Sequence, residues 1–455
     1  MGYDIVLGRL RKEYLKLGTD ASALLGKMYV TMGKTTSLAN NIYMDVNTSH
    51  AVLIAGKRGG GKSYTMGVMA EAILALPDFV RKNIGMLFFD TMGVYWTTKY
   101  PNYKQSDDLD KWKLSPVGFE NEVIVYVPSG YYNYYKDRGV PVDKPFTINP
   151  TDLSAPEWCT LFNLELASDI GVCIERAINL AKKLNRNYSL DDIKQIIQAD
   201  QTNDNRVKSA SYNRFESAEG WGLFDINATP LQEFVKRGKM SVIDISVYAS
   251  ASGGFDIRSL VIGIVCRRLL ENRMVVRKLE ELQELNKQFT YFSSAKSSKE
   301  EGETEEQAKE IPLVWLFVDE GHEFFPKDKV TLATQPLIQI LREGRQPGVN
   351  LVIATQQPGK IHTDAITQSD IVISHRLTAE LDLNALGEVM SAYTPGSVAK
   401  SMNDLPKLNG AALIMDDKTE NVYPVQVRPR LTWHGGGSPT ALPSDYETPN
   451  KPEEY

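Results

Sequence analysis

The chain has few cysteines and histidines and lacks any long apolar run. Its three cysteines, Cys159, Cys173 and Cys266, each stand alone in an apolar or helical context, which is no disulfide framework and fits a reducing compartment. The five histidines show no spacing typical of a zinc site. No stretch approaches the roughly eighteen apolar residues of a membrane span, and the charged opening MGYDIVLGRLRKEY does not resemble a secretory leader. We therefore expect a soluble, cytoplasmic protein without a membrane partner.

An excess of positive charge is also lacking. The chain carries 51 Lys and Arg against 57 Asp and Glu, a formal net charge of −6. This balance argues against a surface that coats duplex DNA, but affinity for nucleic acid follows local clusters of basic residues. Composition therefore leaves nucleic-acid binding undecided.

The most informative stretch that is present is a glycine-rich string. Residues 56–63 read GKRGGGKS, which fits G-x-x-x-x-G-K-[ST] and follows the apolar run Ala51–Ala55. A strand, this loop and then a helix form the context of a phosphate-binding loop, in which backbone N–H groups surround a polyphosphate. We expect Lys62 to reach the β- and γ-phosphates and Ser63 to bind Mg²⁺. The predicted nucleotide contacts are Gly56, Lys57, Arg58, Gly59, Gly60, Gly61, Lys62, Ser63 and Tyr64.

A second string ends an apolar run in two acids. Residues 313–320 read LVWLFVDE, the Walker B form. We expect Asp319 to hold Mg²⁺ together with Ser63, and Glu320 to activate the attacking water. The alternative is a strand that ends in surface acids, which the phosphate loop upstream makes the weaker interpretation.

A third string contains candidate sensors of the γ-phosphate. LREGRQPG at 341–348 precedes the apolar run Val349–Ala354, and Thr355 and Gln356 follow it. Gln356 is the candidate sensor at the strand tip. The arginines are either surface groups that pair with Glu343 or Glu323, or donors that enter a neighbouring subunit's site.

Apolar runs separated by helical patterns predict a wound α/β sheet. Further runs lie at 84–89, 123–127 and 240–245 and are almost continuously apolar, as in strands buried on both faces of a parallel sheet. Residues 1–48 read as a short β-rich segment, 49–150 and 239–434 as the two parts of the core, and 151–238 as a helical insertion. We expect an exposed loop at 293–310 and a flexible tail at 435–455.

These motifs together resemble the HerA branch of the FtsK–HerA motor ATPases. The resemblance rests on GKRGGGKS, DTMGVY at 90–95, VDEGHEFF, REGRQPGVNLVIATQQP, and VQVRPR with HGG near the end. It covers about residues 42 to 436. The resemblance implies a RecA-like P-loop fold, ATP and Mg²⁺ as cofactors, a homohexameric ring, double-stranded DNA as track and a partner nuclease.

The resemblance also assigns individual residues. Arg345 takes the position of the family's trans-acting arginine, and Asp90 that of a strand-end acid near the nucleotide. Two departures stand out, since Val94 occupies a position where relatives commonly have Glu, and the first fifty residues are short for the family's β-barrel.

Other clusters allow two interpretations each. His322 after Walker B is expected to be structural rather than catalytic. The string YYNYYKDR at 131–138 either packs over a sheet edge or stacks on bases. Arg428 and Arg430 lie either at the edge of the core or near a neighbour's nucleotide. A basic cluster on one helical stretch is either solvated, subunit-facing or pore-lining; it comprises Arg267, Arg268, Arg273, Arg277 and Lys278.

The leading functional hypothesis is therefore an ATP-hydrolysing ring motor that moves along double-stranded DNA. An ATP-regulated scaffold of an effector complex is the alternative from another class, and a packaging or conjugation motor is a third.

Overall fold

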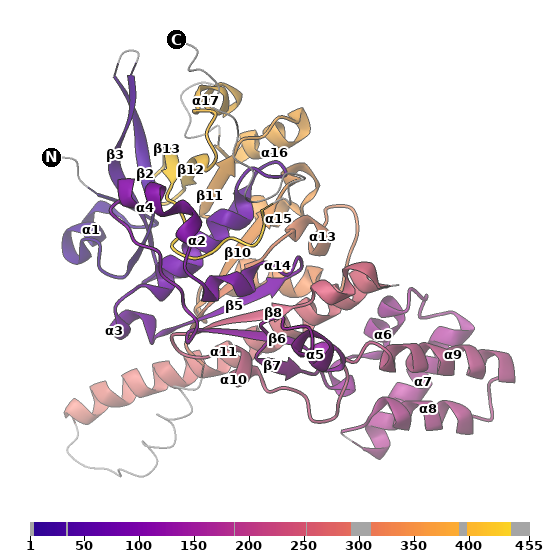
Figure 1. Cartoon of the computed structure of the whole chain (residues 1–455). Coiled ribbons are helices and arrows are strands. Elements are labelled where there is room, and N and C mark those ends of the chain that lie inside the picture. The colour runs from indigo at the N-terminus through magenta and orange to yellow at the C-terminus, as the bar shows by residue number, and fades with distance from the viewer. Residues whose placement is uncertain are drawn as a thin grey trace.

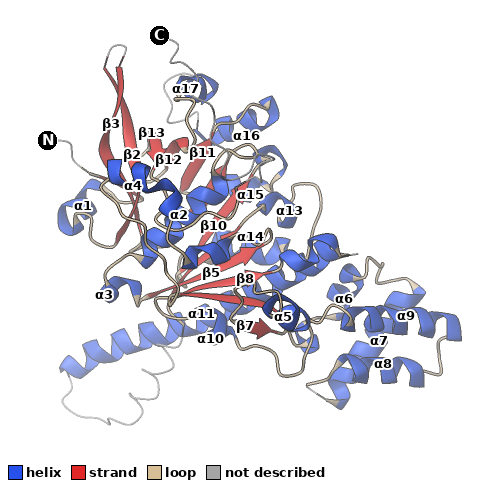
Figure 2. Cartoon of the chain, viewed as in Figure 1, coloured by secondary structure: helices blue, strands red, loops and turns tan. Residues whose placement is uncertain are grey.

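One sheet organises the whole chain. The computed structural model describes residues 4–32, 35–185, 187–251, 253–292, 311–390 and 398–437. In these residues thirteen strands form a single sheet in the order β1-β3-β2-β13-β12-β11-β4-β10-β9-β5-β8-β6-β7 (Figures 1 and 2). The strands are β1 (Ile5–Leu7), β2 (Ser22–Met32), β3 (Thr35–Asp45), β4 (Ala51–Ala55), β5 (Ile84–Asp90), β6 (Val123–Pro128), β7 (Lys144–Phe146), β8 (Met240–Asp244), β9 (Leu313–Val318), β10 (Val349–Thr355), β11 (Ile371–His375), β12 (Ala411–Asp416) and β13 (Asn421–Val427).

The eight strands from β11 to β7 are parallel to their neighbours. Every residue of β5, β8, β10 and β11 is buried, which explains why these strands are mostly apolar rather than alternating. Along β4, Val52 and Ile54 belong to one apolar cluster and Leu53 and Ala55 to another. The sheet is thus covered on both faces, and the predicted α/β class with a mostly parallel sheet is confirmed.

The other part of the sheet is mostly antiparallel and joins the two ends of the chain. β12 and β13 extend the parallel part, and Val425 of β13 pairs with Met28 of β2. The β-rich N-terminal segment therefore continues the main sheet rather than forming a separate barrel. The sequence analysis did not predict β1, β7 or β11 to β13; β1 and β7 have only three residues each, and Pro424 interrupts the pattern of β13.

Helices fill the connections between strands. The helices are α1 (Arg11–Leu17), α2 (Lys62–Leu74), α3 (Asp78–Arg81), α4 (Ser106–Lys111), α5 (Ser129–Lys136), α6 (Ala155–Leu161), α7 (Asp169–Leu184), α8 (Leu190–Ala199), α9 (Asn205–Glu219), α10 (Leu231–Phe234), α11 (Gly254–Phe292), α13 (Gly321–Phe324), α14 (Thr334–Glu343), α15 (Thr363–Thr367), α16 (Glu380–Met390) and α17 (Val398–Asp404). Short 3₁₀ turns η1 (Tyr95–Lys99), η2 (Tyr103–Gln105), η3 (Pro150–Asp152), η4 (Ser246–Ser250) and η5 (Pro358–Lys360) complete the connections. Among the described helices, none combines the length and apolar character needed to cross a bilayer.

The helical insertion leaves the sheet after β7 and returns to it at β8. Figure 1 shows α6 to α9 as a separate lobe beside the sheet. Trp158 of α6 organises the lobe's core, with its ring 5.0 Å from that of Phe215 in α9 and 5.1 Å from that of Phe224. The predicted helical insertion at 151–238 thus contains α6 to α9 and the single turn of α10. The loop predicted at 293–310 and most of the predicted tail lie outside the described residues.

Candidate nucleotide site

The glycine-rich string forms a loop between β4 and α2, at the carboxyl edge of the parallel strands. Gly59 and Gly61 have φ values of +71° and +104°, which L side chains rarely adopt. Gly61 is the N-cap of α2, so the N–H groups of the first helical turn point toward the loop. Lys57 and Arg58 are exposed on its outside. The loop therefore has the form of an anion-binding cradle at a helix N-terminus.

Tyr64 was predicted to contact nucleotide, and the structure directs its side chain elsewhere. Its hydroxyl donates to Gln105 Oε1 (3.0 Å) and accepts from the Arg430 N–H (2.6 Å). The part of Tyr64 that remains available to a phosphate is its backbone N–H in the first turn of α2.

Lys62 lies under the loop with its ammonium group directed back toward it. The side chain is buried, and Nζ donates to the carbonyl oxygen of Lys57 (3.4 Å). Burial lowers the pKa of Lys62, whereas the nearby charges of Glu320 and Asp319 raise it. A desolvated cation between a glycine loop and two acids is suited to a polyphosphate.

Asp319 joins the loop to the Walker B strand. The Ser63 hydroxyl donates to Asp319 Oδ2 (2.7 Å), and the Tyr95 hydroxyl donates to the same oxygen (2.8 Å). Oδ1 accepts the backbone N–H of Glu320 (2.9 Å). Tyr95, which is fully buried, was quoted in the DTMGVY motif without a role, and the structure gives it one in orienting Asp319.

Glu320 lies beside Asp319 in a strained conformation. Its φ of +52° and ψ of +41° are left-handed, a state that costs a non-glycine residue about 1–3 kcal/mol and is concentrated at functional sites. Oε1 accepts from Gln356 Nε2 (2.8 Å), while Oε2 is buried with no hydrogen-bond partner among the described residues. Burial and the neighbouring Asp319 raise the pKa of Glu320. The free oxygen is the feature expected of a base that receives a proton from water.

Gln356, which lies at the tip of β10, therefore contacts the site through its hydrogen bond to Glu320. His322 lies close by, with Nδ1 3.3 Å from Thr355 Oγ1 and 3.6 Å from Glu320 Oε2. Burial and the charge of Lys62 lower the pKa of His322. The structural role expected for His322 stays a prediction.

Asp90 is fully buried at the end of β5 and acts on its own loop. Its carboxylate accepts backbone N–H groups from Met92, Gly93 and Tyr95 at 3.2, 2.7 and 2.8 Å. Burial and the charge of Asp244 on the adjacent strand raise its pKa to about 7. Asp90 thus fixes the turn that carries Tyr95, and its predicted contact with nucleotide stays a prediction.

His375 is a site residue that sequence reasoning missed. It ends β11, is fully buried, and lies against the loop, since a Cβ on Gly56 would come within 2.8 Å of the His375 Cβ. Nε2 lies 2.8 Å from Thr65 Oγ1 and Nδ1 3.2 Å from the Ala411 carbonyl. Burial lowers its pKa to about 4, so the ring is neutral. The signal in the sequence that could have revealed His375 is a polar residue directly after an apolar run, the same pattern that revealed Asp319.

Arg345 lies at the opposite edge of the sheet from this cluster. It is exposed in the turn between α14 and the start of β10, whereas Gln356 follows the other end of the same strand. The turn is held by Arg273 of α11, whose Nε donates to the Pro347 carbonyl (2.7 Å). Arg345 is therefore not part of its own chain's site. The alternative pairs with Glu343 and Glu323 are absent among the described residues, where the neighbouring Arg342 pairs with Asp364 (2.7 Å).

Arg428 and Arg430 are core residues of this chain. Both are buried against Glu71 of α2, with Arg428 Nη1 2.5 Å from Oε1 and Arg430 Nε 3.8 Å from Oε2. Glu71 also accepts the N–H groups of Leu431 and Thr432 (2.8 and 3.0 Å). This network fastens the C-terminal segment across the helix that carries the phosphate loop.

The remaining aromatic and basic clusters are engaged within the chain. Residues 129–136 form α5 rather than a loop; Tyr131 packs edge-on against Tyr248, and Arg138 covers the Tyr134 ring at 3.6 Å. All four arginines of the predicted basic cluster form ion pairs: Arg267 with Glu157, Arg268 with Asp152, Arg273 with Glu280, and Arg277 with Glu280 and Glu281. These arginines do not form an open basic surface.

The residues present fit ATP and Mg²⁺. The loop supplies N–H donors and a buried ammonium group, as a polyphosphate requires. The Ser63 hydroxyl and the Asp319 carboxylate are hard oxygen ligands already in contact, which suits Mg²⁺. The unpartnered Glu320 oxygen leaves a place for water.

Comparison with known proteins bears on the family of the chain. The sequence profile described as "Helicase HerA, central domain" matches residues 26–268, and that of "Zonular occludens toxin (Zot)" matches residues 256–385. The chain is similar to the probable DNA double-strand break repair helicase HerA of Methanocaldococcus jannaschii, at 26% identity over 73% of this chain and 63% of the relative. It is 25% identical to the DNA double-strand break repair helicase HerA of Saccharolobus solfataricus, over 73% of this chain and 56% of the relative. The chain thus spans about 60% of the length of these curated relatives.

One solved structure shows a similar fold. VirB4 of Thermoanaerobacter pseudethanolicus superposes with a TM-score of 0.53 at 11% identity, over 90% of this chain and 97% of VirB4. The likeness bears on fold alone, and it confirms the predicted RecA-like P-loop architecture. With its phosphate loop, Walker B acids and a profile match over more than half of its length, the chain belongs to the HerA family.

Proposed function

We propose that this protein hydrolyses ATP as a homohexameric ring motor that moves along double-stranded DNA. The observation that carries the proposal is the unpartnered, buried Glu320 oxygen beside Asp319, Ser63 and the phosphate loop. The relatives' names support DNA as the track and double-strand break processing as the setting. A partner nuclease belongs to the same proposal.

The roles of this chain's residues follow from their chemistry. Backbone N–H groups of residues 59–64 hold the phosphates, and Lys62 balances charge on the transferred group. Ser63 and Asp319 would hold Mg²⁺, which would supply positive charge against the phosphates. Glu320 Oε2 takes the proton of the attacking water, and Gln356 keeps the other carboxylate oxygen in place.

The position of Arg345 supports the proposed ring. In its own chain it lies at the amino edge of the sheet, away from Lys62 and Glu320. If Arg345 acts on a nucleotide, that nucleotide is therefore bound by an adjacent copy, and hydrolysis then depends on assembly.

The test is ATP hydrolysis by the purified protein with and without linear double-stranded DNA. We expect several-fold stimulation by DNA and loss of all activity in Lys62→Ala. Hydrolysis that is indifferent to DNA would contradict the motor and favour an ATP-regulated scaffold. Absence of any Lys62-dependent hydrolysis, with or without DNA, would contradict the enzymatic proposal itself.

A further inference from the structure

The start of the phosphate loop is held between two strands of the sheet. β10 and β11 lie on either side of β4, the strand from which the loop leaves. The N–H of Gly56 donates to the Thr355 carbonyl at the end of β10 (3.3 Å). The N–H of Lys57 donates to the carbonyl of Arg376 (3.3 Å), which directly follows His375, the last residue of β11. The end of β11 thus forms part of the support on which the loop lies.

The side chain of His375 lies against the glycines of this loop. A Cβ added to Gly56 would lie 2.8 Å from the His375 Cβ, so position 56 has no room for a larger residue. A Cβ on Gly60 would lie 3.7 Å from the same atom, and one on Gly61 would lie 3.5 Å from Cε1 of the ring. His375 is fully buried. The side chain therefore packs against both ends of the glycine-rich stretch.

Two hydrogen bonds fix the orientation of the His375 ring. Nδ1 lies 3.2 Å from the carbonyl oxygen of Ala411, at the start of β12. A carbonyl oxygen only accepts, so in the neutral ring Nδ1 carries the proton and donates it. Nε2 then accepts from the hydroxyl of Thr65, which lies 2.8 Å away and is buried in the first turn of α2. The ring thus joins β12 to the helix whose N-terminus faces the loop.

Such a support lowers the free-energy cost of binding a polyphosphate. Glycine loses more conformational freedom on ordering than any other residue, and residues 59–61 are three glycines in succession. Their N–H groups must also point in one direction before they can bind an anion together. If the loop is ordered before the ligand arrives, this ordering weakens folding rather than binding.

We propose that His375 is a positioning residue that, together with Thr65, holds the phosphate loop in its ATP-binding shape before ATP is bound. The inference rests on the proposed ATP site and gives a role to a residue outside the sequence motifs. In this role His375 acts through the loop and not on the reacting atoms. Because the loop holds the phosphates before and during their transfer alike, loss of His375 should weaken ATP binding and leave the maximal rate of hydrolysis nearly unchanged.

The first measurement is the affinity of the purified full chain for the fluorescent analogue methylanthraniloyl-ATP in the presence of Mg²⁺. His375→Phe keeps an aromatic ring but removes both hydrogen bonds, and its dissociation constant should rise about tenfold. His375→Gln can place an amide oxygen where Nε2 accepts from Thr65, so its dissociation constant should rise about threefold at most. The maximal rate at saturating ATP should stay within about twofold of wild type in both variants.

Thr65 gives an independent route to the same contact. Thr65→Val keeps the shape of the side chain, so it decides the matter if circular dichroism shows that His375→Phe does not fold. Its dissociation constant should rise about threefold. The double variant Thr65→Val/His375→Phe should bind no more weakly than His375→Phe alone, since both changes remove one shared hydrogen bond. Fully additive losses would overturn the pairing of these two residues.

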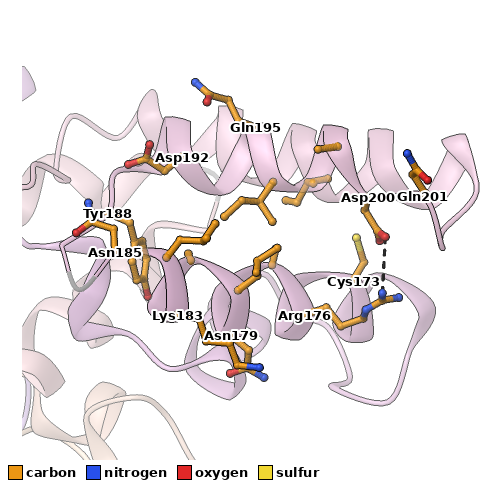
Figure 3. A pocket seen from close by; sticks show the side chains of 17 residues that line it. Cys173, Arg176, Asn179, Lys183, Asn185, Tyr188, Asp192, Gln195, Asp200 and Gln201 are labelled. Atoms are coloured by element: carbon orange, nitrogen blue, oxygen red, sulfur yellow. Dashed lines mark ion pairs between the residues drawn. The ribbon is translucent and has the colours of Figure 1, made fainter.

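The matched control changes a buried hydroxyl far from the loop in sequence and in the fold. Tyr188→Phe removes the hydroxyl of a buried tyrosine on the wall of the hollow between α7 and α8, in the helical insertion (Figure 3). It should bind the analogue as the wild type does. A loss of affinity in Tyr188→Phe equal to that in His375→Phe would overturn the inference, because the effect would then not be local to the loop.

Hydrogen exchange of the nucleotide-free proteins tests the loop itself. Peptides that cover residues 56–61 should exchange several-fold faster in His375→Phe than in the wild type or in Tyr188→Phe, because the loop is no longer held. Equal exchange and equal affinity in His375→Phe and wild type would overturn the inference and leave the proposed function standing. A wild type that binds the analogue without hydrolysing ATP would contradict the proposed function and leave the positioning of the loop intact.

Discussion

The nucleotide site and the outer helices differ in which side chains they bury and which they leave exposed. At the carboxyl edge of the sheet, polar groups are buried and hold each other, as Ser63 and Tyr95 hold Asp319. On α7 and the distal part of α11, apolar side chains such as Leu184 and Leu285 remain exposed. Burying a polar group costs free energy unless the group forms a hydrogen bond or an ion pair. Exposed apolar side chains that gather in one patch mark a surface for interaction.

This difference shows which contacts the chain makes alone. The phosphate loop, the two acids and Gln356 are brought together by strands of one sheet. The arginine and the outer apolar surfaces point away from that site. We infer that one copy alone brings together the phosphate loop, the two acids and Gln356, whereas Arg345 can act only at the site of another copy.

The largest effect is expected at the base. Glu320→Gln keeps the size and shape of the side chain beside Gln356 but removes the proton acceptor, so the rate of ATP hydrolysis should fall about 10³-fold. ATP binding, measured by a fluorescent analogue, should persist. The matched control Glu323→Gln alters a nearby acid that pairs with Arg258 and should retain most activity. Equal loss in both variants would contradict the assignment of Glu320.

The second effect concerns stability. Glu71→Ala leaves Arg428 and Arg430 buried without their carboxylate, and the free energy of unfolding should fall by about 3–5 kcal/mol. Leu184→Ala removes an apolar side chain from the outside and should change it by at most about 0.5 kcal/mol. Chemical denaturation of the monomeric form measures both. A larger loss of unfolding free energy for Leu184→Ala than for Glu71→Ala would contradict this difference between the two regions.

A third effect depends on pH. His50 is buried between Asp45 and Asp370, at 3.3 and 2.6 Å, and these carboxylates raise its pKa to about 9. A raised pKa means that the stabilisation is complete below about pH 6.5, the unfolded value, and is lost as pH rises through 9. The difference in unfolding free energy between wild type and His50→Gln should thus shrink by about 2–3 kcal/mol from pH 6 to pH 10. A constant difference across this range would mean that His50 is neutral in the fold.

The smallest effect tests Tyr95. Tyr95→Phe removes one hydroxyl from Asp319, so the Mg²⁺ concentration for half-maximal hydrolysis should rise about tenfold while the fold is kept. Tyr126→Phe, which removes a buried hydroxyl bonded to the distant Glu233 carbonyl, is the control. An unchanged Mg²⁺ requirement in Tyr95→Phe would contradict a role for Tyr95 in orienting Asp319.

Sequence alone predicted the parts of the molecule that short-range patterns encode. The phosphate loop, Asp319 and Glu320 follow buried apolar strands, and the site where they meet follows from parallel strands sharing one carboxyl edge. Long-range contacts were not predictable in this way. Nothing near His375 indicates that it lies against Gly56, and nothing near Glu71 indicates that Arg428 is its partner 357 positions later.

The assignments of Arg428 and of the α11 arginines show the same limit. A basic residue near the C-terminus allowed a core or an intersubunit role, and only the position of Glu71 on α2 decides for the core. Arg345 is the reverse case, since its sequence position suggested a trans role and the structure leaves it exposed at the far edge.

One mixing experiment tests most directly whether each site is completed by a neighbour. Arg345→Ala and Lys62→Ala proteins should each lack ATP hydrolysis as homogeneous rings. When mixed in equal amounts and reassembled, about a quarter of the contacts should join an intact Lys62 to an intact Arg345, and activity should return in proportion. Mixed rings that form but stay inactive, or an Arg345→Ala ring as active as the wild type, would contradict the account.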